Sequence, residues 1–269
     1  MTEKILNILK ENGVKIAAPI ALSNCDIVRE HKLKRVGFNE YDSLFAVIIA
    51  VPYLTPQKSR NISAYAVPRD YHLYFKELFS SIIPILEATF PGKHFVGFAD
   101  DSPINERDAA AKAGMGIIGD NGMLITEKYS SYVFLGEIIT DLPLECEIKP
   151  IKHCQGCGKC KEVCPISECG QCLSALTQKK GELTVEEMAI IKKYGYAWGC
   201  DKCQEVCPHT LRAIKNATIY TDIDFFKKDT IPTLSSAILD AMSDEDFEKR
   251  AYSWRKRETV KRNLDLLDS

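Results

Sequence analysis

The sequence predicts an α+β protein in which a mixed first domain precedes a cysteine-rich domain and C-terminal helices. Three observations support this fold class. Strand and helix patterns are mixed in the first part of the chain, nine of the 11 cysteines lie between Cys154 and Cys207, and the rest of the chain has helical periodicity. We therefore expect three domains, at residues 1–148, 149–212 and 213–269.

The first domain combines short strands with amphipathic helices. Apolar residues at helical spacing predict helices at 3–12 and 71–90, and Pro84 predicts a kink or break in the second. Apolar runs predict strands at 44–54, 94–99, 123–126 and 132–140, and we expect the last two strands to pair with each other. Ser102 followed by Pro103 predicts the start of a helix that ends near residue 113.

The later part of the chain is predicted to be mostly helical. Thr184 with acidic residues after it predicts a helix at 185–194. Two more helices are expected at 233–242 and, after Ser243, at 244–267.

Composition narrows the classes of function. A formal net charge of −2 gives no global reason to expect binding to nucleic acid or to an anionic membrane. No apolar run is long enough to span a bilayer, and the first residues lack the apolar core of a signal peptide. We therefore expect a cytoplasmic protein.

The cysteines form a ladder that is typical of iron–sulfur proteins. Residues 154–165 have the pattern C-x2-C-x2-C-x3-C-P, and residues 200–208 repeat C-x2-C-x3-C-P. In two-cluster ferredoxins, the first three cysteines of such a run bind one [4Fe–4S] cluster and the fourth binds the other. Zinc sites also use C-x2-C pairs, but they rarely show this double pattern, and clustered thiols without an export signal argue against disulfides.

Crossed ligation divides the ladder between two clusters. The first cluster is expected to have a complete set of ligands, which are Cys154, Cys157, Cys160 and Cys207. The second is expected to have three ligands from the motifs, which are Cys164, Cys200 and Cys203. Spacing alone leaves its fourth ligand open between Cys172 and Cys169.

Several other segments resemble the epoxyqueuosine reductase family, which is related to the reductive dehalogenases. The segments that match motifs of this family, in order along the chain, are 62–72 (ISAYAVPRDYH), 98–107 (FADDSPINER), 113–119 (AGMGIIG), 134–137 (FLGE), 172–177 (CLSALT), 199–204 (GCDKCQ) and the pair Arg262-Asn263. The resemblance covers most of the chain.

This resemblance implies a fold, cofactors and a reaction. It implies a nitroreductase-like first domain that holds a cobalamin, and two clusters that reduce cobalt to Co(I) for reductive removal of an epoxide oxygen. It implies Asp100 as the proton donor and Cys172 as the remaining cluster ligand. The residues that it implies for contact with the corrinoid or substrate are Arg69, Asp70, Tyr71, His72, Gly114, Gly116 and Gly119. The implied partners are tRNA and an external low-potential electron donor of the flavodoxin or ferredoxin type.

Three departures from the family pattern concern the substrate. Asp120 stands where the family has lysine, the long loop expected near residues 25–38 is short, and the C-terminal repeat domain has no counterpart. The substrate could therefore be epoxyqueuosine in tRNA or a smaller related compound. The alternative is a ferredoxin-type electron-transfer or corrinoid-reducing protein without substrate chemistry.

Some of the features have a purely structural explanation as well. Asp100 could be an ordinary turn carboxylate, residues 69–72 a simple helix start, and the glycines after residue 113 a tight turn. The basic stretch 249–262 could follow RNA phosphates or form a solvated helix face, and we favour the second interpretation.

Overall fold

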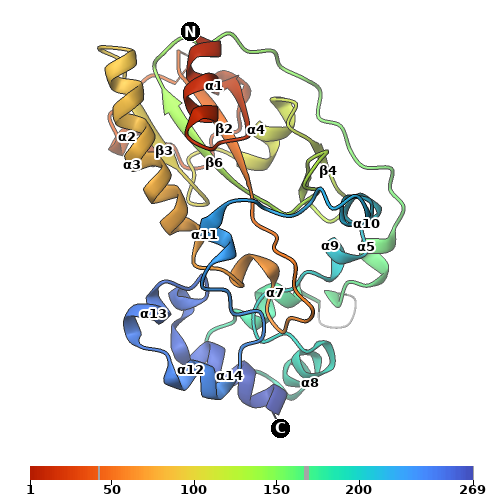
Figure 1. The fold of residues 1–269 in the computed structure, drawn as a ribbon. Helices are drawn as coiled ribbons and strands as arrows, with labels where there is room; N and C mark the ends of the chain where they lie inside the picture. Colours follow the sequence, from red (N-terminus) through yellow and green to blue (C-terminus); the bar gives the residue numbers. More distant parts are fainter. Residues whose placement is uncertain (42, 167–169, 269) are drawn as a thin grey trace. The chain divides into compact units, whose positions relative to one another are not determined.

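In the computed structural model, which describes residues 1–41, 43–166 and 170–268, the chain divides into two compact units. The first unit contains residues 1–52 and 74–157, and the second contains residues 53–73 and those from 158 on (Figure 1). These units do not follow the predicted boundaries at 148 and 212. The segment 53–73, which was expected in the first domain, folds with the cysteine-rich part of the chain.

An antiparallel sheet forms the centre of the first unit. Its strands lie in the order β1 (Ile16–Ala21), β2 (Phe45–Pro52), β6 (Val133–Thr140) and β3 (Phe95–Phe98). A separate hairpin pairs β4 (Ile117–Ile118) with β5 (Leu124–Ile125). The prediction that the last two strands would pair with each other is therefore wrong, because β6 pairs with β2 and β3 instead.

The helices of the first unit are α1 (Thr2–Glu11), α2 (Glu30–Arg35), α3 (Tyr71–Thr89) and α4 (Glu106–Lys112), and a short 3₁₀ turn, η1, covers Leu22–Asn24. The helix α3 continues through Pro84, so of the predicted kink or break, the break does not occur. The start predicted for α4 is also wrong. Its N-cap is Asn105, whose side chain accepts a hydrogen bond from the backbone N–H of Asp108 at 3.5 Å.

Gly136 explains how α3 packs closely against β6. A Cβ atom at this position would lie 2.5 Å from the Phe75 ring, so only glycine leaves room for the aromatic ring. Because neighbouring strand residues point to opposite faces, Glu137 points to the other face of the sheet. The helix α4 packs against β6, β1 and β2, and the buried apolar cluster of that region includes Ala109 and Ala110.

The second unit is built from short helices and long connections. Its helices are α5 (Lys159–Glu162), α7 (Leu173–Thr177), α8 (Val185–Tyr194), α9 (Lys202–Glu205), α10 (Pro208–Lys215), α11 (Asp224–Lys227), α12 (Ser236–Ala241), α13 (Asp244–Glu248) and α14 (Lys256–Asp268), with 3₁₀ turns η2 (Ala64–Ala66) and η3 (Ser253–Arg255). The predicted start of α8 is confirmed by a capping box between Thr184 and Glu187. The long helix expected at 244–267 is divided into α13, η3 and α14.

Trp198 is the largest buried side chain of the second unit and connects its parts. The indole is fully buried, and its Nε1 donates a hydrogen bond to the Tyr65 hydroxyl at 2.7 Å. Its ring packs edge-on against the buried ring of Tyr252. The segment that precedes α3 is thereby joined to the cysteine-rich segment and to the C-terminal helices of the same unit.

Candidate functional site

Asp100 lies in the first unit, just after the end of β3 and before α4. Its φ of 62° is in the left-handed region, which aspartate enters more readily than most other non-glycine residues. Its backbone N–H donates a hydrogen bond to Oε1 of Glu106 at 3.3 Å, and its side chain is exposed. The position at a strand end ahead of a helix agrees with the position that the sequence predicts.

Two further acidic residues, Glu106 and Glu137, form a pair near Asp100. Glu137 is fully buried on β6, where it is paired in register with Phe98 of β3 and Ile48 of β2. The Ser102 hydroxyl donates a hydrogen bond to Oε1 of Glu137, and it accepts one from the backbone N–H of Ile104 at 3.0 Å. Sequence analysis missed this pair, although an acidic residue inside the apolar strand FLGEIIT was a usable signal.

The carboxyl groups of Glu106 and Glu137 lie close enough for each to shift the pKa of the other. No donor among the described residues reaches the buried Oε2 of Glu137. Burial raises the pKa of Glu106 to about 7, and burial together with the charge of Glu106 raises the pKa of Glu137 well above its usual range. Both shifts favour a protonated carboxyl group in this pair.

Gly114 and Gly116 lie between α4 and β4, and Gly119 lies in the loop of the β4–β5 hairpin. A Cβ atom at Gly116 would lie 2.4 Å from the backbone oxygen of Ile125, and one at Gly119 would lie 2.5 Å from Oδ1 of Asn121. Gly114 has a φ of 79°, and a Cβ atom there would meet the Lys149 side chain. Close packing within this unit therefore explains all three glycines, and their contact with a corrinoid stays a prediction.

The same hairpin supports Cys154, the first cysteine of the ladder. The backbone N–H of Cys154 donates to the carbonyl of Ile118 at 3.0 Å, and Ile118 forms a parallel bridge with His153. The backbone N–H of Asp120 lies 3.4 Å from the Cys154 sulfur. Amide hydrogen bonds to cysteine sulfur are one of the ways in which proteins adjust the reduction potential of a cluster. Asp120, which stands where the family has lysine, therefore lies beside Cys154, a predicted cluster ligand.

The later parts of the two cysteine motifs, which both belong to the second unit, adopt matching structures. Cys160 lies in α5 and Cys203 in α9, and these two four-residue helices contact each other. After each helix, a cysteine precedes a proline, and Cys207 is the N-cap of α10 with Pro208 in the first turn. The repeated motif in the sequence therefore corresponds to a repeated helical turn in the structure.

Cys172 lies close enough to Cys200 to influence its ionisation. Cys172 is the N-cap of α7. Burial, with smaller contributions from the charges of Asp201, Cys203 and Cys172, raises the pKa of the Cys200 thiol to about 12. The alternative ligand, Cys169, lies outside the described residues. The structure therefore gives Cys172 a position near Cys200, a predicted ligand of the second cluster.

The donor set fits iron–sulfur clusters, although the residues that the structure describes contain no preformed group of three or more metal-binding side chains. All ten of the described cysteines are free thiols, eight of them in the ladder. The chemistry and spacing of these thiols fit cubane clusters. Cys154 and Cys157 belong to the first unit and Cys160 and Cys207 to the second, so the complete set for the first cluster stays a prediction.

Asp201, between two predicted ligands, ties the cysteine-rich segment to the segment before α3. Its buried carboxylate accepts hydrogen bonds from the Ser63 hydroxyl and the Ala64 backbone N–H, both at 2.6 Å. It also pairs with Arg60 at 3.0 Å. Burial raises the pKa of Asp201, and Arg60 and these hydrogen bonds oppose that shift. These contacts of Asp201 hold the second cysteine motif in place.

Residues 69–72 form the start of α3. Arg69 lies over the Phe225 ring, 4.3 Å from its centre, and its Nε lies 3.7 Å from the Asp229 carboxylate. Oδ1 of Asp70 accepts hydrogen bonds from the backbone N–H of His72 at 2.9 Å and from its ring at 2.8 Å. The Tyr71 ring stacks on the His72 ring. These contacts give each residue a structural role, and corrinoid contact by these residues stays a prediction.

The basic stretch 249–262 is largely engaged within the second unit. Arg257 donates to the carbonyls of Leu239 and Met242, each at 2.7 Å. Arg262 donates to the carbonyl of Lys179 at 2.9 Å. Lys249 and Lys261 form ion pairs, with Glu245 and Asp240 respectively. These contacts agree with the favoured interpretation, in which the charges are structural, although Trp254 is 57% exposed.

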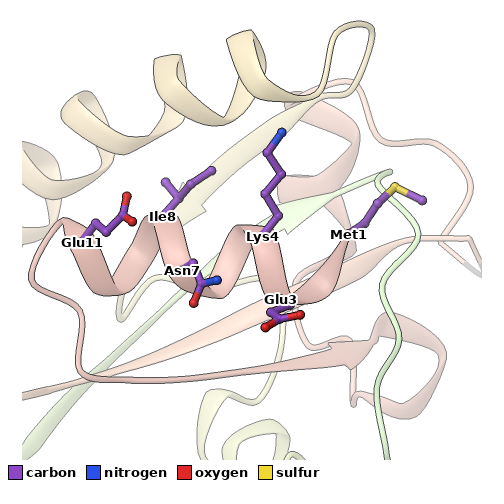
Figure 2. A pocket seen from close by; sticks show the side chains of 6 residues that line it. All are labelled: Met1, Glu3, Lys4, Asn7, Ile8 and Glu11. Atoms are coloured by element: carbon purple, nitrogen blue, oxygen red, sulfur yellow. The ribbon is translucent and has the colours of Figure 1, made fainter.

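A surface hollow of about 450 Å³ lies along α1, far in the sequence from these groups. Figure 2 shows its lining side chains along the helix, which are Met1, Glu3, Lys4, Asn7, Ile8 and Glu11. They form no arrangement suited to catalysis. Of the helices that the structure describes, none combines the length and the apolar character needed to cross a membrane.

Comparisons with known proteins identify clear relatives, although no family model matches the chain. An epoxyqueuosine reductase from Gloeobacter violaceus is 31% identical over 229 residues, which are 80% of this chain and 70% of the relative. One from Synechocystis is 35% identical over 164 residues, which are 58% of this chain and 57% of the relative. The chain thus matches between about half and two thirds of the length of several such relatives.

Solved structures show the same fold. An epoxyqueuosine reductase solved with an epoxyqueuosine-modified tRNA-Tyr stem loop superposes with a TM-score of 0.77 and 25% identity, over 98% of this chain and 80% of that one. The catabolic reductive dehalogenase NpRdhA superposes with a TM-score of 0.51 and 15% identity, over 97% of this chain and 38% of that one. The similarity to this reductive dehalogenase is one of fold alone.

Proposed function

The chain belongs to the epoxyqueuosine reductase family, and from this membership we propose that it is an iron–sulfur oxidoreductase that removes the oxygen of an epoxide. The substrate is epoxyqueuosine in tRNA or a smaller related epoxide. The observation that carries the proposal is the 31% identity that extends over 80% of the chain. The cysteine ladder and Asp100 at the end of β3 provide the matching chemistry.

In this proposal, the ladder is the internal electron supply. One cluster is held by Cys154, Cys157, Cys160 and Cys207, and the other by Cys164, Cys172, Cys200 and Cys203. Each cluster passes one electron at a time from an external donor of the flavodoxin or ferredoxin type. A corrinoid, when bound to the first unit, would supply a cobalt nucleophile for the epoxide carbon. The support for a corrinoid is the family resemblance.

Asp100 is the proposed proton donor. Its exposed carboxyl group, at the end of β3, can reach a substrate oxygen, and proton donation lowers the cost of breaking a carbon–oxygen bond. The proposed RNA partner follows from the solved relative with a tRNA stem loop.

Anaerobic reconstitution with iron, sulfide and cobalamin tests this function. We expect visible absorption from both cofactors and turnover of an epoxyqueuosine-containing anticodon stem loop. Asp100→Asn should lower turnover by roughly a hundredfold or more, because it removes the acid. The control is Asp101→Asn, whose side chain is 69% exposed and pairs with Lys32, and it should stay near the wild-type rate.

Three outcomes would contradict parts of the proposal. Full activity of Asp100→Asn would remove Asp100 as the donor. Absence of corrinoid binding would leave electron transfer by the clusters as the function. Corrinoid binding without turnover of either the RNA or the free nucleoside would favour a corrinoid-reducing protein.

Iron counting tests the eighth ligand. The wild-type chain should hold about eight irons, and Cys172→Ser should reduce this to about four, since a cubane that loses one of four thiolates is labile. Cys169→Ser is the matched control and should keep the full number. The opposite result would assign the ligand to Cys169.

A further inference from the structure

Near Asp100, the proposed proton donor, the acidic residues Glu106 and Glu137 offer a second source of protons. The backbone N–H of Asp100 donates to Glu106, whose carboxyl group lies close to that of Glu137. Ser102 holds one oxygen of Glu137. The charge of the exposed Asp100 acts on Glu106, and the charge of Glu106 acts on the fully buried Glu137.

We propose that Glu106 and Glu137 store a proton inside the first unit and return it to Asp100 during each catalytic cycle. The inference rests on the proposed function. The two glutamates act through Asp100 and do not touch the substrate.

The number of protons that the reaction consumes explains why a stored proton is needed. Converting an epoxide to an alkene breaks two carbon–oxygen bonds, consumes two electrons and two protons, and releases the oxygen as water. The electrons come from the external low-potential donor through the clusters. Asp100 can hold one proton at a time, so it must be protonated again within a turnover. A free aspartic acid is almost entirely ionised at neutral pH, so its proton must come from a group that remains protonated.

The surroundings of the pair favour one retained proton. Two ionised carboxylates in contact inside a protein repel each other strongly, so the pair takes up a new proton from solvent after it has given one to Asp100. The charged and titratable groups that act on Glu106 besides Glu137 are Asp100, which raises its pKa, and Arg29, which lowers it. Near Glu137 lies the Cys25 thiol, whose pKa burial raises to about 12, so this thiol remains neutral.

Infrared difference spectroscopy can detect the stored proton without any turnover. We expect the cluster-loaded wild-type protein to show a protonated-carboxyl C=O band near neutral pH, and the band should shift in D₂O. Glu137→Gln should remove it. Glu127→Gln, which changes an exposed acid of the same unit, should keep it.

The pH profile of turnover tests whether the stored proton is used. Glu137→Gln should lower turnover by roughly tenfold near neutral pH, where the wild-type pair is protonated, and should thereby remove the alkaline limb. Ser102→Ala should keep the fall in turnover at alkaline pH, but the midpoint of that fall should rise by about half a pH unit or more. The reason is that the change removes a hydrogen bond that stabilises the ionised Glu137. A merely structural role would not produce these opposite effects. Glu106→Gln provides a second test of the pair should Glu137→Gln fold poorly.

The outcomes separate this inference from the proposed function. A wild-type protein without the carboxyl band would overturn the proton store, whatever its activity. A wild-type enzyme with the band, whose pH profile is unchanged in both glutamate variants, would also overturn it and would leave the function intact. A protein with the band that turns over no epoxide would overturn the proposed function instead.

Discussion

Glu137 is a carboxyl group inside a sheet core, and it makes the stability of the first unit depend on pH. The pKa of Glu106 is raised from 4.5 in the unfolded chain to about 7, and that of Glu137 is raised further. The native state therefore binds more protons than the unfolded state above pH 4.5. The free energy of unfolding must fall as the pH rises, by an amount on the order of 3 kcal/mol for Glu106 alone.

Denaturation by urea at several pH values measures this effect. Wild-type stability should fall between about pH 5 and about pH 8, and Glu137→Gln should fall less steeply because one titrating carboxyl group is gone. The exposed Glu127→Gln should follow the wild-type curve. If the curves of Glu137→Gln and the wild-type protein are parallel, the glutamate pair is not protonated as we infer.

At the residue scale, the sequence predicted the position of Asp100 better than its surroundings. A strand pattern followed by a helix start placed Asp100 correctly at the end of β3. Ser102 was predicted to cap α4, but its hydroxyl binds Glu137 instead. Local sequence cannot distinguish a serine that caps a helix from one that binds a buried carboxyl group. In both cases the serine hydroxyl accepts a backbone N–H, and only its second partner, on a distant strand, differs.

At the scale of elements, Asn263 connects α14 to the cysteine-rich segment. Its buried side chain donates to the carbonyls of Thr177 at 2.7 Å and of Ala197 at 2.9 Å. These carbonyls flank α8, and Thr177 ends the helix that follows Cys172. One side chain therefore holds both ends of the insertion between the two cysteine motifs.

Replacement of Asn263 by leucine should destabilise the second unit. The change leaves two buried carbonyls without their donor, so we expect a loss of about 2–4 kcal/mol in the free energy of unfolding. Asp265→Asn, at an exposed position of the same helix, should change stability by less than about 0.5 kcal/mol. Urea denaturation of the cluster-loaded protein measures both variants, and equal stability of the two would show that Asn263 is not a structural link.

Elements with strong local signals were predicted well. The capping box at Thr184 and the apolar stripe of α3 were sufficient for their helices. The pairing of β6 was predicted wrongly because an apolar run indicates a strand without naming its neighbour. The division of the C-terminal helix also went unnoticed, since η3 and the left-handed Lys256 interrupt a pattern that suits one continuous helix.

At the scale of the whole molecule, the sequence predicted a mixed fold and a cysteine-rich region, but not which segments fold together. The segment 53–73 belongs to the second unit because Asp201 and Trp198 bind it there. Such contacts join residues more than 130 positions apart, and composition contains no signal for them. The ladder was predictable because its spacing is itself the chemical requirement.

Removal of the clusters should affect the two units differently. The helices α5, α7 and α9 contain only four or five residues, and helices of this length are unstable without tertiary support. In the proposed holoprotein, the clusters supply that support. Chelation of iron should therefore increase amide hydrogen exchange between residues 154 and 215, while the strands β1, β2, β6 and β3 keep their protection.

The control is Cys146→Ser, which removes an exposed thiol outside the ladder and should change neither the iron content nor the exchange pattern. Unchanged exchange between residues 154 and 215 after complete loss of iron would show that the short helices are held by the apolar contacts of α7 and α8 alone. The sheet of the first unit serves as an internal reference, because each of its strands is held by long-range pairing that requires no thiol. Loss of protection in the sheet as well would mean that the two units unfold together, and that the clusters stabilise the whole chain.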